Sequence, residues 1–204
     1  MKERNSGFTL VEVVVVLAVV AILAAILTPN IVKNIKDSKI ARAANETQVI
    51  AGALASFYKD LGRWPTSRGN NANNNDFLYL LVGDGTVPGN SGANSQQWRG
   101  GGGWGGARMD TFVNHLIEND PKDAANNYPV TGDLKWAGPY IIKVKADPWG
   151  NHYSCNIAYT WFAGGNTNGV GVLSAGPDRT FNTRVNQPMA TFTVLGDDII
   201  TRIQ

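Results

Sequence analysis

The chain carries the motif GFTLVE at residues 7–12, and the run VVVVLAVVAILAAIL follows it up to residue 27. From residue 8 to the end of this run, only Thr9 and Glu12 are polar. As an α-helix that rises about 1.5 Å per residue, the stretch would span roughly 30 Å, the thickness of one hydrocarbon core. The sequence therefore predicts a membrane-spanning helix at residues 8–28 with one carboxylate near its start.

That carboxylate requires a partner, because a glutamate in a lipid-crossing helix costs several kcal/mol unless a positive group pairs with it. Cleavage between Gly7 and Phe8 would create an α-amino group one helical turn from Glu12. A neighbouring copy, shifted along its axis, could bring this amine to the carboxylate, so that the charge is neutralised only on assembly. The short leader, with Lys2 and Arg4, would stay in the cytoplasm because basic flanks favour that side.

GFTLVE with its apolar tail resembles the class III signal of type IV pilins and type II secretion pseudopilins. The resemblance implies that a prepilin peptidase cleaves after Gly7, that Phe8 is N-methylated, and that Glu12 is the assembly carboxylate. It makes residues 1–7 a leader and residues 8–28 a transmembrane and assembly helix. An ordinary signal peptide or a plain single-pass anchor is the alternative, although the apolar core of a secretory signal is usually about 7–15 residues long.

Composition limits the other possibilities. A chain of 204 residues has room for one membrane helix and one globular domain. A net charge of +2 without a basic block gives no electrostatic footprint for binding nucleic acid. The single cysteine, Cys155, cannot close an intrachain disulfide, and we expect it to be a small buried residue. His115 and His152 lack metal-binding spacing, and no nucleophile motif is present, so we do not expect an enzyme.

The helix is expected to continue beyond the apolar run. Pro29 predicts a kink or local melting, or it marks the exit from the membrane. Residues 29–62 have an amphipathic pattern, in which Ile50 and Leu54 belong to the face that we expect to be buried. Gly62 then predicts the helix end, because glycine readily adopts the left-handed conformation there. One helix of about 50 residues is favoured over two helices that are broken at Pro29.

Residues 63–204 are expected to form a globular head rich in loops. An Asn-rich run at 70–75 and a Gly/Trp-rich run at 100–106 predict exposed loops, and no Gly-Lys-Ser/Thr follows the glycines to make a phosphate site. Residues 77–82 predict a short helix or strand. We expect helix at 111–119, with His115 on its polar surface side.

Strands are predicted at residues 153–162 and 170–174. A small antiparallel sheet laid against the amphipathic helix would bury both apolar faces. The fold class is therefore α+β: a long N-terminal helix, transmembrane in its first half, packed against a small antiparallel β-sheet head with long loops. This architecture is that of the type IV pilin-like proteins that the N-terminus resembles.

Three further stretches resemble the major pseudopilin of type II secretion: LGRWPT at residues 61–66, WAGPYI at 136–141 and DPWGN at 147–151. The last is typical of a turn, in which Asp147 bonds back to the backbone and Trp149 anchors the turn on the core. We expect these stretches to be structural.

Acidic residues flank the last loop, with Asp178 on one side and Asp197 and Asp198 on the other. In the pseudopilins that the chain resembles, the corresponding loop binds calcium, which implies these three carboxylates as ligands. Calcium takes six to eight oxygen ligands, and backbone carbonyls and water can supply the others. Arg179 stands where relatives commonly have glycine and could neutralise Asp178 instead, while residues 185–194 form an insertion. A calcium site and a salt-bridged, solvated loop both remain open.

The resemblance implies a structural subunit of a pseudopilus that drives protein export by type II secretion. The subunit would be a single-pass inner-membrane protein before assembly, with its head in the periplasm and its filament periplasmic. Its partners would be further copies of itself, the prepilin peptidase, minor pseudopilins and the inner-membrane assembly platform, and not nucleic acid. The alternative is a type IV pilin of a surface fibre for adhesion, motility or DNA uptake; such pilins often carry a C-terminal disulfide, which Cys155 alone cannot form.

Overall fold

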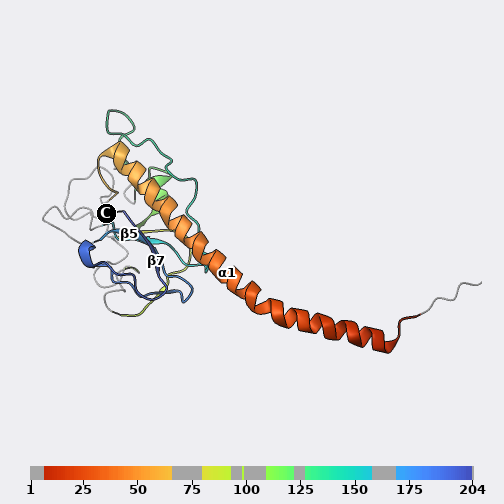
Figure 1. Cartoon of the computed structure of the whole chain (residues 1–204). Helices are drawn as coiled ribbons and strands as arrows, with labels where there is room; N and C mark the ends of the chain where they lie inside the picture. Colours follow the sequence, from red (N-terminus) through yellow and green to blue (C-terminus); the bar gives the residue numbers. More distant parts are fainter. Residues whose placement is uncertain are drawn as a thin grey trace, which may run out of the picture. The chain divides into compact units, whose positions relative to one another are not determined.

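The computed structural model describes residues 7–65, 80–92, 98, 109–121, 127–157 and 169–203. The chain divides into two compact units, Met1–Lys39 and Ile40–Gln204, and we call the second unit the head. Figure 1 shows helix α1 and the strands β5 and β7 of the head. The basic leader residues Lys2 and Arg4 and the two low-complexity runs, at 70–75 and 100–106, lie outside the described residues.

Helix α1 runs from Leu10 to Leu61 as one element of 52 residues. It continues through Pro29, so the predicted local melting and the two-helix alternative are wrong. A proline inside a helix costs about 3 kcal/mol or more, yet the helix continues on both sides of Pro29. At the other end Gly62 adopts a φ of 66° and its N–H donates to the carbonyl of Tyr58 at 2.8 Å. This is the predicted glycine cap.

The first unit consists mainly of the N-terminal part of α1. Every residue from 7 to 42 is exposed, including the large apolar side chains of the run. Among the described residues, α1 is the helix that is long and apolar enough to cross a membrane, and its apolar segment near the N-terminus is fully outside the core. None of the described residues covers these apolar side chains.

The head contains a sheet of five strands in the order β3-β1-β4-β5-β7. These are β1 (Leu80–Val82), β3 (Met109–Thr111), β4 (Ser154–Cys155), β5 (Gly171–Ser174) and β7 (Ile199–Arg202). A two-stranded parallel sheet joins β2 (Gly89–Asn90) to β6 (Thr180–Phe181). The short helix α2 (Phe112–Leu116) follows β3, and a 3-10 turn, η5, covers Met189–Thr191.

The sheet is mixed, which corrects the prediction of an antiparallel sheet. β1, β4, β5 and β7 pair in antiparallel fashion, but β1 and β3 run parallel, with Leu81 opposite Asp110. Parallel neighbours need a long crossover rather than a tight turn. The connection from Val82 to Met109 provides that length.

Alternate residues of the strands face two different cores. Leu81, Cys155 and Val172 pack with Ile50, Leu54 and Phe57 of α1. Leu80 and Leu173 point to the opposite face, where they pack with Trp98 and Phe181. This alternation follows from the two-residue period of a strand. The predicted buried face of residues 29–62 is therefore confirmed in its second part, from Ala43 to Leu61.

Most predicted elements of the head are present in shorter form. Residues 171–174 form β5, and the run at 77–82 contributes strand β1, at 80–82. The predicted helix at 111–119 is α2. Of the strand predicted at 153–162, Ser154–Cys155 is strand β4, and residues 158–162 lie outside the described residues.

Candidate functional site

The N-terminal motif forms a helix cap. Thr9 precedes the first residue of α1, and its backbone N–H and hydroxyl each donate to Oε2 of Glu12 at 2.8 Å. The N–H of Glu12 donates to the hydroxyl of Thr9 at 3.3 Å. This reciprocal pair is a capping box, in which a threonine and an acid three residues later satisfy each other's free backbone donors. This role was not predicted from the sequence, although the Thr-x-x-Glu spacing indicates it.

The cap leaves one carboxylate oxygen of Glu12 available. The hydrogen bonds that the described residues make to this side chain all use Oε2. Phe8, at the predicted cleavage point, is 89 % exposed. Glu12 can therefore keep its cap and still receive a positive group through Oε1.

Three acids gather at the loop that precedes β7, as the sequence predicts. The N–H of Asp178 donates to Oδ2 of Asp197 at 2.9 Å. Oδ2 of Asp198 accepts the N–H groups of Asn182 and Thr183 at 2.9 and 2.6 Å. These bonds join the two halves of the loop across the 185–194 insertion, which therefore does not separate them.

The loop holds its acids closely because of its backbone. Gly176 has a φ of 67°, and a Cβ at that position would lie only 2.1 Å from the carbonyl oxygen of Asp197. Only glycine permits that approach. Arg179 also has a positive φ, of 59°, and no ion pair connects it to an acid of the described residues. The alternative in which Arg179 neutralises Asp178 through a salt bridge is therefore not seen among the described residues.

The environment of the loop disfavours bare negative charge. Burial raises the pKa of Asp198 to about 6, against the lowering effect of hydrogen bonds from Thr183 and Asn182. Burial and the neighbouring Asp178 raise the pKa of Asp197. Oδ1 of Asp197 and Oδ1 of Asp198 are buried and receive no hydrogen bond within the described chain. Two carboxylate oxygens without donors fit the chemistry of a hard cation.

Protein side chains alone do not complete such a site. Over the described residues, no three His, Cys, Asp or Glu side chains are grouped as metal ligands. A calcium ion here would need the two buried Oδ1 atoms together with backbone carbonyls and water.

The DPWGN stretch is a turn, as predicted, and its hydrogen bonds hold the turn together and attach it to β5. Oδ1 of Asp147 accepts the N–H groups of Trp149 and Asn151, and Oδ2 accepts the hydroxyl of Ser174 on β5. Gly150 has a φ of 92°. Asp147 is buried whereas Trp149 is half-buried, so the acid anchors the turn more than the aromatic ring does.

His115 is buried, which corrects the prediction of a surface residue. Its Nε2 lies 3.0 Å from Oδ2 of Asp110, and its Nδ1 lies 2.7 Å from the hydroxyl of Tyr128. All three side chains are buried. Since a carboxylate only accepts, Nε2–H donates to Asp110. Burial raises the pKa of Tyr128, which keeps its phenol protonated.

Cys155 and His152 are also buried in the head. Cys155 is a free, fully buried thiol, as predicted, and burial raises its pKa. Thiol reactivity depends on the thiolate, so this cysteine is inert. His152 is 3 % exposed. Both histidines are therefore buried.

Comparison with known proteins gives some matches that cover only the N-terminal motif or about a third of the chain, and others that cover most of it. The family model "Prokaryotic N-terminal methylation motif" matches residues 2–28. Type II secretion system core protein G of Aeromonas hydrophila is 36 % identical over 66 residues, 32 % of this chain and 46 % of that protein. Fimbrial protein EcpC of Eikenella corrodens is 37 % identical over 65 residues, 32 % of this chain and 42 % of that protein. The chain thus matches less than half the length of these two relatives.

A third relative extends over the head. Type II secretion system core protein G of Klebsiella pneumoniae is 24 % identical over 176 residues, which is 86 % of this chain and 87 % of that protein. No solved structure matches significantly. The names of these relatives describe components of a secretion system or a fimbria, not enzymes. The methylation motif at residues 2–28, the long helix with its small mixed sheet, and these relatives show that the chain is similar to type IV pilin-like proteins and, among them, to core protein G of type II secretion systems.

Proposed function

We propose that the chain is the structural subunit of a pseudopilus that drives protein export by type II secretion. The observation that carries this proposal is the fully exposed apolar half of α1 behind a methylation motif. Such a helix needs lipid before assembly and the helices of other copies after it. The core protein G relatives support the secretion role over other roles of the same fold.

Processing and assembly use the same few residues. A prepilin peptidase cleaves between Gly7 and Phe8 and the new N-terminus is methylated. The α-amino group of Phe8 in one copy then pairs with Oε1 of Glu12 in the next. Glu12 retains its cap to Thr9 throughout, because the cap uses the other oxygen.

The orientation follows from the flanks of the apolar segment. The leader lies in the cytoplasm, the helix crosses the inner membrane once, and the head folds in the periplasm. Minor pseudopilins and the inner-membrane assembly platform are the further partners of this role.

A second candidate is a pilin of a surface fibre, favoured by the match to a fimbrial protein. Against it, the lone Cys155 is buried in the core and unable to form a C-terminal disulfide. Deleting the coding sequence in the native host separates the two. Loss of exported proteins with intact surface fibres supports the secretion role, and loss of fibres with normal export overturns it.

We also propose that the acidic loop binds calcium through the Oδ1 atoms of Asp197 and Asp198, with Asp178 nearby. The two buried oxygens without donors support this, and the bound ion would offset the charge that burial disfavours. Calcium titration of the intact protein in detergent tests it. We expect saturable binding that Asp198→Asn abolishes and Asp133→Asn, at a distant exposed acid, leaves unchanged. A melting temperature unaffected by both calcium and chelator would contradict it.

A further inference from the structure

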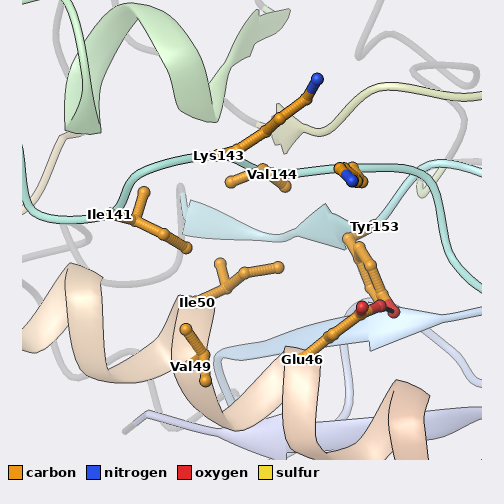
Figure 2. Close-up of a pocket in the computed structure, with 8 residues that line it drawn as sticks. Glu46, Val49, Ile50, Ile141, Lys143, Val144 and Tyr153 are labelled. Atoms are coloured by element: carbon orange, nitrogen blue, oxygen red, sulfur yellow. Dashed lines mark hydrogen bonds between the residues drawn. The ribbon is translucent and has the colours of Figure 1, made fainter.

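A small apolar groove lies in the head beside α1. Figure 2 shows Val49 and Ile50 of α1 on one side and Ile141 and Val144 on the other. The groove has a volume of about 150 Å³. An apolar cavity of this size holds a group as large as benzene, so it can accept one aliphatic side chain.

The rim of the groove is basic. Its acid, Glu46, already accepts the hydroxyl of Tyr153 and pairs with Arg42 at 2.8 Å. Lys143 and Lys145 also line the groove, are exposed, and form no ion pair with the described acids. A matching occupant therefore presents an apolar side chain next to a carboxylate.

The chain itself carries such an element at residues 130–134, in the sequence VTGDL. Val130 and Leu134 are 63 % and 58 % exposed, and Asp133 between them is exposed as well. Gly132 has a φ of 96°. The segment is thus a turn that presents two large apolar side chains and one free carboxylate to the outside.

This turn cannot be the occupant of its own groove. Leu134 lies against Gly62, since a Cβ on that glycine would be 3.4 Å from it. Gly62 is thirteen residues beyond Val49, which is about 20 Å along a helix axis. The turn of a second copy reaches the groove when the two copies are parallel and displaced by about this distance. Such a contact joins two different surfaces and so repeats in an open filament.

We propose that the groove receives the 130–134 turn of a second copy, with Leu134 between Val49 and Val144 and Asp133 beside Lys143 and Lys145. This inference rests on the proposed function, because it needs an assembled filament. It adds a head-to-head contact between neighbouring copies that is independent of the N-terminal helix.

Charge reversal tests the contact in filaments made by the full-length chain. We expect Lys143→Glu with Lys145→Glu, and Asp133→Lys alone, each to lower filament yield by about threefold, as for an exposed ion pair. Combining all three changes restores the yield, because the charges are again complementary. Arg184→Glu, at an exposed arginine that belongs neither to the groove nor to the turn, is the matched control and leaves the yield unchanged.

Cross-linking gives a second readout that does not depend on yield. Under oxidation, Val49→Cys with Leu134→Cys in one chain gives a ladder of covalent dimers and larger multimers, whereas either change alone gives none. Val87→Cys with Leu134→Cys is the control, and Cys155 is too buried to contribute. The proposed contact would be overturned if the charge reversals left filament yield normal, or if the triple change failed to restore the yield. It would also be overturned if the cysteine pair gave no ladder, or cross-linked only to another protein. If the unmodified chain formed no filaments, the proposed function itself would be contradicted.

Discussion

The two halves of α1 differ in where their apolar side chains lie. In the first half, the side chains of Leu17 and Ile22 are exposed, at 62 % and 60 %. In the second half, Leu54 and Phe57 are fully buried against the sheet. In one continuous helix, the apolar side chains of the second half are therefore covered by the head, whereas those of the first half are not covered by the described residues.

This difference separates folding from assembly. The second half completes the head, because the apolar faces of the sheet and the helix cover each other. The first half is not covered by the described residues, and under the proposed function lipid or the helices of other copies would stabilise it. Substitutions in the two halves should thus affect different measurements.

The largest effect on folding is expected in the second half. Phe57→Ala removes a ring that packs edge-on against Tyr128 at 4.9 Å, and should lower the free energy of unfolding of the fragment Ile40–Gln204 by about 3–5 kcal/mol. Val20→Ala in the full-length chain should leave the melting of the head unchanged. Equal destabilisation by both changes would show that the halves do not fold separately.

The buried His115 should give the next largest effect. His115→Ala leaves the carboxylate of Asp110 and the hydroxyl of Tyr128 without this partner inside the head, which should cost about 2–4 kcal/mol in denaturant unfolding. The same change in an Asp110→Ala background should cost less, since the bond between these two side chains is then already absent. Equal costs in both backgrounds would mean that the two residues are not coupled.

A smaller effect is expected where the helix is tied to the sheet. Tyr153→Phe removes the hydroxyl that donates to Glu46, and should lower the free energy of unfolding by about 1 kcal/mol. Tyr58→Phe changes an exposed ring on the same helix and serves as the control. A loss of zero at Tyr153 would indicate that packing alone holds the two elements together.

The last prediction concerns pH and the acidic loop. The pKa of Asp198 is about 6 in the folded head, against 3.8 for the free side chain. Between these values the folded state binds more protons than the unfolded state, so this residue's contribution is present below about pH 4 and is lost as the pH rises through 6. Melting curves of Asp198→Asn should lack that loss, and calcium should reduce it in the unmodified head. A steeper loss with calcium would contradict the ion site.

Much of the fold was predictable because local chemistry decides it. The apolar run, the amphipathic spacing and Gly62 predicted α1 and its end, and β5 and the turn at Asp147 followed from residue type. The direction of β3 was not predictable, since strand pairing depends on a long connection rather than on local pattern. Side-chain contacts between segments that are distant in the sequence, such as the hydrogen bond between Thr47 and Thr201, could not be predicted from local pattern either.

The error at His115 has a specific cause. Phe112, Val113, Leu116 and Ile117 suggested an apolar face centred between them, which left His115 outside. The structure buries Phe112, His115 and Leu116 and only half-buries Val113 and Ile117. A three-residue step from Phe112 places His115 on the buried face, so the spacing did contain the answer. What it could not contain was Asp110 and Tyr128, which satisfy a polar ring inside the core.

The most direct test of the role of the exposed half separates the two functions of Glu12. Glu12→Gln keeps the capping box, because glutamine can accept the same bonds from Thr9, but it removes the charge. Thr9→Val keeps the charge and removes the two hydrogen bonds of the cap that use the hydroxyl. With leader cleavage monitored in the same cells, electron microscopy should show no filaments for Glu12→Gln and near-normal filaments for Thr9→Val. Abundant filaments from Glu12→Gln would contradict the claim that a negative charge in the uncovered half of α1 must find its partner in another copy.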